Sequence, residues 1–346
     1  MFLSAKTKGY FVDCTEESLL LARTSASAPP FVVEAIQECP LGDADVIAGA
    51  LKVLQPKKSG NYLQAVCGVY TPRRVIRRVT FDLKRIKEAG YLNEVASQQL
   101  RVEPDHNTLI VLNSQDGTEY DMAAGTQKEA VICGLPTEEI VALQDQLLAM
   151  GVYPDRLEIG SLATIGALVD YLAFTKVKVP TLILEISADQ TQSFIVSAAG
   201  LETSRPIQQG LDAMIPVVQK ELGLKDEESA RKLFFSNTFD FTGLAPALIR
   251  RLVKELQSSI GFYEVQTGQS IGHVICPLLS PKLAWIEDAI ASQLSVTVLK
   301  PELAPWLQSR HITFADTVPA AQDARRLGLF GLMAQYTAHG PAPEKA

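Results

Sequence analysis

Residues 181–196, TLILEISADQTQSFIV, contain the pattern that decides the fold of this chain. An apolar run at 182–184 ends in Glu185, a short polar turn follows, and a second apolar run starts at 194. Two short apolar runs on either side of a polar turn are typical of a β-hairpin. Residues 10–21 repeat the arrangement, because YFVD is followed by the polar turn CTEE and then by LLL. The repeat predicts two copies of one core unit, one in each half of the chain, facing a shared cleft.

The composition is that of a globular protein of roughly two domains, with 346 residues, 47% of them hydrophobic and 21% charged. A net charge of −7 argues against a nucleic-acid-binding protein, which would carry a basic excess. No apolar run approaches the ~18 residues that a membrane span needs, and the first residues lack a signal-peptide pattern. The five cysteines are odd in number, widely spread and without a C-x-x-C spacing, which indicates reduced thiols. We therefore expect a cytoplasmic protein.

Strands and helices alternate along the sequence, which predicts an α/β fold. Between the two halves, residues 73–151 read as a compact βαββα insert, with helices at 83–100 and 137–150 and strands at 107–112 and 129–133. Thr137 is expected to cap the second of these helices. The predicted domains are domain I at 1–176 with the insert at about 73–151 and a completing C-terminal helix at 319–340, domain II at 177–318, and a flexible tail at 341–346.

Four arginines, Arg73, Arg74, Arg77 and Arg78, lie close together at the start of the insert. One interpretation is a basic patch directed toward anionic lipid or an acidic partner. The other is a strand with solvated arginines, which we favour because charged clusters usually belong to the solvated surface.

Two further segments identify a family likeness. Residues 256–268, LQSSIGFYEVQTG, end a long helical pattern, and residues 205–210, RPIQQG, follow the second hairpin. With the order of elements, they resemble the PilM family of type IV pilus assembly proteins, which are relatives of FtsA. The resemblance covers nearly the whole chain and implies an actin-like fold, which is a duplicated ribonuclease H-like fold of two α/β domains with a βαββα insert in the first.

The resemblance also implies a partner and a location. In the family, a groove beside the insert binds the short cytoplasmic N-terminal tail of a PilN-like single-pass inner-membrane protein. We therefore expect such a partner beside residues 73–151, and contact with the inner membrane only through it. Self-association is left open, and a nucleic-acid partner is not expected.

An actin-like nucleotide site needs small residues at both hairpin turns, so that backbone N–H groups approach the phosphates, and an aspartate for the water shell of magnesium. In the first loop Asp13 is present, but Thr15 stands where the family has glycine. Glu16 and Glu17 follow it. Two carboxylates a few ångströms from a triphosphate would repel it by ~1 kcal/mol or more per pair.

The other two loops depart from the family pattern as well. The second loop, residues 185–189, has a longer acid and no glycine, and the third, residues 276–280, has two leucines where a nucleotide needs space. Lys232 matches a family lysine near the adenosine. The candidate residues of this degenerate nucleotide cleft are Asp13, Thr15, Glu185, Ser187, Asp189, Lys232 and Ser280.

We interpret Asp13 and Glu185 as strand-end acids satisfied by turn amides, in preference to magnesium ligands. The sequence therefore predicts a pseudo-ATPase with no catalytic residue, no metal site and no cofactor. Its predicted function is that of a non-catalytic cytoplasmic scaffold of a type IV pilus-like assembly machine.

The alternative is an ATP-binding switch or weak ATPase of the same machine, or of a type II secretion counterpart. Mg-ATP would then bind, with Asp13, Glu185 and Asp189 ordering magnesium and water. A sugar or acetate kinase on the same superfold is a third reading, which the missing glycine-rich loops disfavour.

Overall fold

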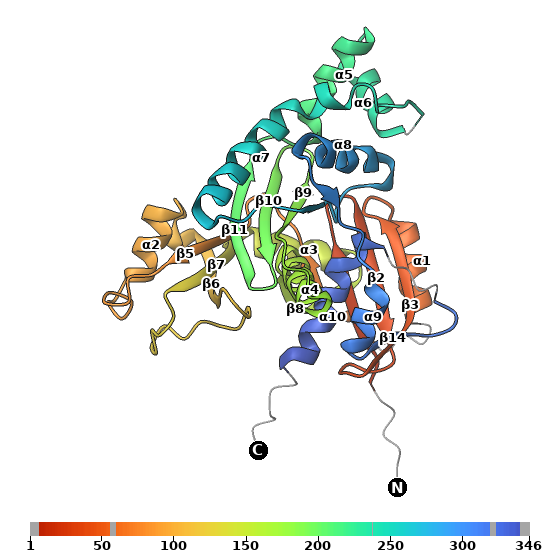
Figure 1. Ribbon diagram of the computed structural model, residues 1–346. Coiled ribbons are helices and arrows are strands. Elements are labelled where there is room, and N and C mark those ends of the chain that lie inside the picture. Colours follow the sequence, from red (N-terminus) through yellow and green to blue (C-terminus); the bar gives the residue numbers. More distant parts are fainter. Residues whose placement is uncertain (1–6, 56–59, 237, 319–322, 340–346) are drawn as a thin grey trace. The chain divides into compact units, whose positions relative to one another are not determined.

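The computed structural model describes residues 7–55, 60–236, 238–318 and 323–339 (Figure 1). The chain divides into two compact units. The first contains the residues up to Tyr171 together with those from Pro301 onward, and the second runs from Leu172 to Lys300.

The first unit is built on a six-stranded sheet with the strand order β14-β3-β2-β1-β4-β8. Its strands are β1 (Gly9–Cys14), β2 (Ser18–Thr24), β3 (Phe31–Pro40), β4 (Leu63–Val69), β8 (Val152–Ile159) and β14 (Ile312–Phe314). The first three strands pair antiparallel in sequence order, and β4 and β8 continue the sheet in parallel.

Helices complete the first unit. They are α1 (Ala44–Leu54), α3 (Thr137–Ala149), α4 (Gly160–Thr175, which belongs to this unit up to Tyr171), α9 (Leu303–Ser309) and α10 (Leu327–His339), with the short 3-10 turn η4 (Ala324–Arg326) before α10. Asp43 caps α1, because its carboxylate accepts a hydrogen bond from the amide of Val46 at 3.1 Å. The helix α10 lies against β1 and β4, which brings this helix next to the first hairpin.

The insert has its own three-stranded sheet, in the order β5-β7-β6. Its elements are β5 (Val75–Thr80), α2 (Tyr91–Gln99), the 3-10 turn η1 (Pro104–His106), β6 (Asn107–Asn113) and β7 (Glu129–Pro136), followed by α3. The aromatic rings of Phe81, Tyr91 and Tyr120 meet edge to face in a small core of their own. This order of elements is the βαββα pattern that the sequence predicted.

The second unit repeats the plan of the first in a five-stranded sheet, β11-β10-β9-β12-β13. Its strands are β9 (Thr181–Ile186), β10 (Thr191–Ser197), β11 (Gly200–Ile207), β12 (His273–Ile275) and β13 (Thr297–Val298). Again three antiparallel strands are followed by two parallel ones. Every residue of β9 is buried, which is why this strand is, after Thr181, an apolar run interrupted only by Glu185.

The helices of the second unit are α5 (Ile215–Leu222), α6 (Glu227–Ser236), α7 (Ala245–Thr267) and α8 (Ala284–Leu294), with 3-10 turns η2 (Leu211–Met214) and η3 (Pro281–Leu283). Pro216 lies at the start of α5 and moves the beginning of the helix, as its missing N–H requires. The helix α7 ends at Gly268, whose φ of 69° is readily adopted only by glycine.

The sequence-based boundaries differ from the structure at particular places. The helix expected at 83–100 begins only at Tyr91, after Gly90 with a φ of 82°. Thr137 is the first helical residue and not the cap, and its hydroxyl lies 3.1 Å from that of Thr108. The elements α6, α9 and β14 had not been expected.

Residues 301–318 group with the first unit, although the sequence-based boundary assigned 177–318 to domain II. The physical reason is β14, which pairs in parallel with β3, and Trp306, whose indole donates a hydrogen bond to Asp170 at 2.7 Å. The predicted C-terminal helix at 319–340 is present as α10, starting at Leu327. Residues 319–322 and the expected tail at 341–346 lie outside the described residues.

Candidate functional site

The first hairpin turn is closed by the side chain of Thr15. The amide of Thr15 donates to the carbonyl of Ser18 at 2.9 Å. The Thr15 hydroxyl accepts from the amides of Ser18 at 3.0 Å and Glu17 at 3.3 Å. Backbone amides at this turn would be the donors for a phosphate in an actin-like site. Here two of them already have an acceptor within the turn.

Asp13 lies at the end of β1 and is only 2% exposed. Glycines allow other parts of the first unit to approach its carboxylate closely. A Cβ on Gly328 of α10 would lie 2.6 Å from Oδ2 of Asp13 and 2.5 Å from the hydroxyl of Tyr70. A Cβ on Gly68 of β4 would lie 3.1 Å from Oδ1. The carboxylate is therefore enclosed by β4, Tyr70 and α10 of its own unit.

Tyr70 is itself fixed from several sides. Its hydroxyl lies 3.3 Å from that of Thr164, and a Cβ on Gly160 would lie 2.4 Å from its ring. The guanidinium of Arg74 lies 5.8 Å from the ring centroid and donates to Ser161 at 2.7 Å. The enclosure of Asp13 is therefore built from rigid, buried groups.

The second hairpin turn has the same backbone closure as the first. The amide of Ser187 donates to the carbonyl of Gln190 at 2.9 Å, and the Ser187 hydroxyl donates to the same carbonyl at 3.0 Å. The hydroxyl also reaches Oδ1 of Asp189 at 3.3 Å, so these two predicted site residues do lie together.

The segment that follows β11 packs directly on this second turn. A Cβ on Gly210 would lie 2.5 Å from both the carbonyl oxygen of Ala188 and the amide nitrogen of Gln190. The amide of Asp212 donates to the carbonyl of Ala188 at 2.7 Å. The turn is held from outside by backbone, which cannot move away as a flexible side chain can.

Asp13 and Glu185 occupy equivalent positions in the two units. In the first hairpin Cys14 pairs with Leu19, and in the second Ile186 pairs with Thr191, so each acid precedes the last paired residue of its strand. Glu185 is also 2% exposed and stands opposite Gln192. The two strand-end acids that the sequence analysis selected are thus one structural position in two copies.

The other candidate residues do not join either turn. Lys232 lies on α6 with 74% of its side chain exposed and pairs with Glu228 at 2.6 Å. Its neighbour Arg231 pairs with Asp212 at 2.6 Å, next to the second turn. Ser280 precedes η3, where its side chain makes no capping hydrogen bond.

The third loop belongs to the core of the second unit. Leu279 is buried there, and the amide of Cys276 donates to Oε1 of Glu287 at 2.6 Å. Burial raises the pKa of the Glu287 carboxyl, although the hydrogen bond from Cys276 opposes this. Within the residues that the structure describes, no group of three or more His, Cys, Asp or Glu side chains is placed to hold a metal ion.

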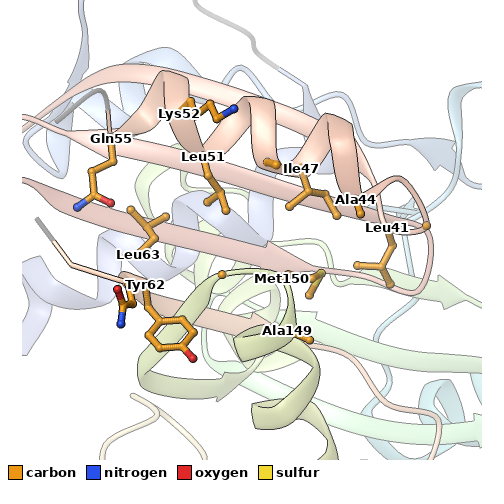
Figure 2. A pocket seen from close by; sticks show the side chains of 14 residues that line it. Leu41, Ala44, Ile47, Leu51, Lys52, Gln55, Tyr62, Leu63, Ala149 and Met150 are labelled. Carbon is orange, nitrogen blue, oxygen red and sulfur yellow. The ribbon is translucent and has the colours of Figure 1, made fainter. Parts of the chain in front are cut away.

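A separate pocket of about 600 Å³ lies in the first unit, where the last helix of the insert returns to the sheet (Figure 2). It is lined by α1, the start of β4 and the end of α3. Figure 2 shows apolar side chains from all three elements around it, with Lys52, Gln55 and Tyr62 as polar neighbours. The apolar side chains are Leu41, Ala44, Ile47, Leu51, Leu63, Ala149 and Met150.

The sequence analysis did not identify Tyr70, Gly68, Gly328 or Gly210 as parts of the two turn environments. Gly210 was quoted only as part of a family segment. The G-x-x-G spacing of Gly328 and Gly331 in the last helix was an available signal, since two glycines on one helix face permit close approach. No sequence pattern around Tyr70 indicates that it lies next to Gly328.

The two sheets share the strand order 3-2-1-4-5, to which β14 adds a sixth strand beside β3 in the first unit. This shared order defines the class of protein as an actin-like α/β fold. The structure thus confirms the predicted fold class. A chain of the PilM-PilN type IV pilus biogenesis complex has a similar structure, with a TM-score of 0.64 and 15% identity. The match covers 96% of this chain and 98% of the other. At that identity the likeness establishes the shared fold.

Two weaker likenesses concern the cytoplasmic domain of EpsL, from the type II secretion system of Vibrio cholerae, and an actin-like protein of Bacteroides thetaiotaomicron. The first has a TM-score of 0.41 at 10% identity and covers 97% of this chain and 96% of the other. The second has a TM-score of 0.44 at 9% identity and covers 89% and 96%. No protein-family model matches the sequence, and no curated protein is significantly similar to it.

None of the helices in the described part of the chain combines the length and the apolar character that a membrane span requires.

Proposed function

We propose that this chain is a non-catalytic scaffold of a type IV pilus-like assembly machine. It binds the short cytoplasmic N-terminal tail of a PilN-like inner-membrane protein, and it is located in the cytoplasm at the inner membrane through that partner. The observation that carries the proposal is the end-to-end match to a chain of the PilM-PilN complex, since both chains are covered almost completely. That complex is named for a partner of the kind proposed here.

The absence of catalysis is proposed from the first of the two hairpin turns. At the first, the Thr15 hydroxyl accepts hydrogen bonds from two amides that a phosphate would need. The Glu16 and Glu17 side chains are exposed beside it. A bound triphosphate would have to displace the hydroxyl and also approach two carboxylates, and both changes oppose binding.

A melting experiment with and without millimolar Mg-ATP tests this part of the proposal. A ligand at a hundredfold excess over its dissociation constant stabilises the folded state by about 2.7 kcal/mol, so binding would raise Tm measurably. We expect no shift for the wild-type chain. A reproducible rise in Tm would contradict the pseudo-ATPase assignment.

Titration with a synthetic tail peptide from a candidate partner tests the binding function. Calorimetry should give saturable binding for the tail and none for a scrambled peptide of the same composition. The absence of saturable binding for every candidate tail would overturn the scaffold proposal.

The pocket of Figure 2 is where we propose that an apolar side chain of the tail is held, because it lies at the end of the insert and is lined by apolar groups. Ala48→Trp fills the pocket from α1, whereas Val53→Trp changes the same helix at an exposed residue outside the lining. Tail binding should weaken at least about tenfold in the first variant and remain within about twofold in the second. Equal affinities of the two variants for the tail would mean that the tail binds elsewhere along the insert.

The ATP-dependent switch remains a second candidate because an acid is present at the same strand end in both units, Asp13 in one and Glu185 in the other. In that case Mg-ATP binds and the two acids, with Asp189, order magnesium and water. Replacing Asp13 by Asn would then abolish an Mg-ATP-dependent rise in Tm, which gives this candidate its own test.

A further inference from the structure

The four arginines at the start of the insert differ in the groups that they contact. Arg73 pairs with Glu138 at 2.6 Å and also contacts Glu139. Arg78 pairs with Glu129 at 3.1 Å. Arg74 is buried and donates to Ser161 and to the carbonyl of Thr71. Three of the four guanidinium groups are therefore bound to side chains or backbone of other segments.

Arg77 is different from these three. Among the described residues, the one hydrogen bond of its side chain runs from Nη1 to the carbonyl of the preceding residue, Ile76, at 2.8 Å. No carboxylate of the described residues comes within ion-pairing distance of it. The residue is nevertheless half-buried, and desolvation lowers the pKa of its guanidinium with no acid to offset the effect. Holding a partly desolvated charge without a counter-ion destabilises the fold.

The surroundings of Arg77 combine apolar side chains with this cation. β5 is an edge strand of the three-stranded sheet, and Arg77 stands opposite Ile132 of β7. Because side chains alternate along a strand, Val75 and Val79 share its face. Val79 is buried and Val75 is half-buried. Val79 packs inside the insert core and is closed to a partner. The accessible part of this face is therefore the half-buried Val75 beside the Arg77 guanidinium, whose remaining N–H groups are unused in the described part of the chain.

We propose that Arg77 binds the carboxylate of an acidic peptide segment from a partner protein that docks along β5. A guanidinium fork matches a carboxylate in two parallel hydrogen bonds, and the half-buried Val75 can contact an apolar side chain next to the acid. The proposal goes beyond the proposed function and does not depend on which tail the chain binds.

A peptide fits this position better than a membrane surface. A bilayer contacts exposed cations, and the more exposed guanidinium here, that of Arg73 with 57% of its side chain exposed, is already paired with two glutamates. A single carboxylate on an extended segment reaches a half-buried group that a flat surface does not.

The experiment measures fluorescence anisotropy of a labelled probe peptide in which valine and threonine alternate around one central glutamate. A twin peptide carries glutamine instead. The full-length chain is compared with Arg77→Met and with the control Arg78→Met, which changes the net charge equally on the adjacent residue. We expect saturable binding of the glutamate peptide, weakened at least about tenfold by Arg77→Met or by the glutamine exchange, and less than threefold by Arg78→Met.

A second readout separates binding from folding. Because Arg77 lacks a counter-ion, Arg77→Met should leave Tm unchanged or raise it, whereas loss of the Arg78–Glu129 pair should leave it unchanged or lower it slightly. Equal binding by the two variants, equal binding of the two peptides, or no saturable binding up to millimolar peptide would each overturn the proposal. So would a fall in Tm for Arg77→Met. Loss of co-sedimentation with phosphatidylglycerol vesicles in Arg77→Met, without peptide binding, would assign the site to lipid phosphate instead.

Discussion

The two hairpins of this molecule have the same backbone and different chemistry. In both, the first residue of the turn donates its amide to the carbonyl three residues later, at 2.9 Å, and an acid precedes the last residue of the strand. Both hydroxyls donate to the carbonyl that closes their turn, at 3.2 Å for Thr15 and 3.0 Å for Ser187. The Thr15 hydroxyl accepts in addition from the amides of Glu17 and Ser18. The duplicated fold fixes where the turns lie, and single side chains decide what the turns can bind.

The groups that enclose the hairpins also differ. In the first unit the strand-end acid meets Tyr70 and the glycine of a helix, Gly328. In the second unit the turn itself meets backbone at Gly210. Each enclosure depends on a missing Cβ, so glycine substitutions are the most direct way to disturb one hairpin without the other.

The largest effect is expected for Gly210→Ala. Its new Cβ would lie 2.5 Å from two backbone atoms of the second turn, and neither atom can rotate away. We expect a loss of about 3 kcal/mol in the free energy of unfolding, measured by urea denaturation. Gly166→Ala is the control, because no atom lies within 4 Å of its Cβ on α4, and it should stabilise by up to about 1 kcal/mol. A neutral Gly210→Ala would mean that the second turn is not held by this contact.

A smaller loss is expected for Gly328→Ala in the first unit. The added Cβ would meet the Tyr70 hydroxyl at 2.5 Å and Oδ2 of Asp13 at 2.6 Å, but the helix gains from replacing glycine. We expect a net loss of about 1–2 kcal/mol by the same urea measurement. Combining it with Tyr70→Phe, which removes one of the two contacted atoms, should recover part of the loss. If the double variant recovers no stability, the strain of Gly328→Ala does not come from the Tyr70 hydroxyl.

Removing the two turn hydroxyls, of Thr15 and of Ser187, should lower the free energy of unfolding by different amounts. Thr15→Val keeps the shape of the side chain and leaves two amides of the first turn without their acceptor, so we expect a loss of about 1–2 kcal/mol. Ser187→Ala removes a hydroxyl that donates to an already bonded carbonyl and should cost about 0.5–1 kcal/mol. Thermal melting of both variants checks the order. Equal losses would mean that the two turns are chemically alike after all.

The smallest effect concerns pH. Burial raises the pKa of Glu287, so the folded state binds this proton more tightly than the unfolded state. The resulting stability is complete below the unfolded pKa, near the ordinary value of 4.5, and is lost as the pH rises through the higher folded pKa. Glu287→Gln keeps an acceptor for the Cys276 amide. Because glutamine does not ionise, this variant should not lose stability at residue 287 as the pH rises.

Urea midpoints at a series of pH values between about 4.5 and 8 check that prediction. The midpoint of the wild-type chain should fall relative to that of Glu287→Gln as the pH rises. Glu158 of the first unit, whose pKa is also raised by burial, remains in both chains and cancels in the difference. If the difference between the two urea midpoints does not change with pH, the pKa of Glu287 is not raised in the folded state.

The sequence predicted much of the fold because its signals were local. The repeated apolar run, acid and polar turn identified both hairpins, and the alternation of strands with helices identified the βαββα insert. The short strand β14 was missed, because three residues carry too little periodicity to be recognised. Its pairing with β3 also explains why the sequence-based domain boundary near 318 differs from the observed division.

For the candidate site, the sequence selected Asp13 and Glu185, because each ends an apolar run with an acid. It associated Lys232 and Ser280 with them through the family resemblance, and the structure brings neither into one of the turns. The arginine cluster was interpreted as solvated surface, but three of its members make hydrogen bonds or ion pairs with other segments of the chain.

By itself the sequence determined that two hairpins of one design exist, each with an acid at the strand end, since apolar periodicity and turn chemistry are properties of neighbouring residues. Only the tertiary structure decided which groups surround those acids. Tyr70 and Gly328 are separated by more than 250 residues in the chain and meet at Asp13 because β4 and α10 pack beside β1. Contacts of this kind depend on how whole elements pack, and no local pattern encodes them.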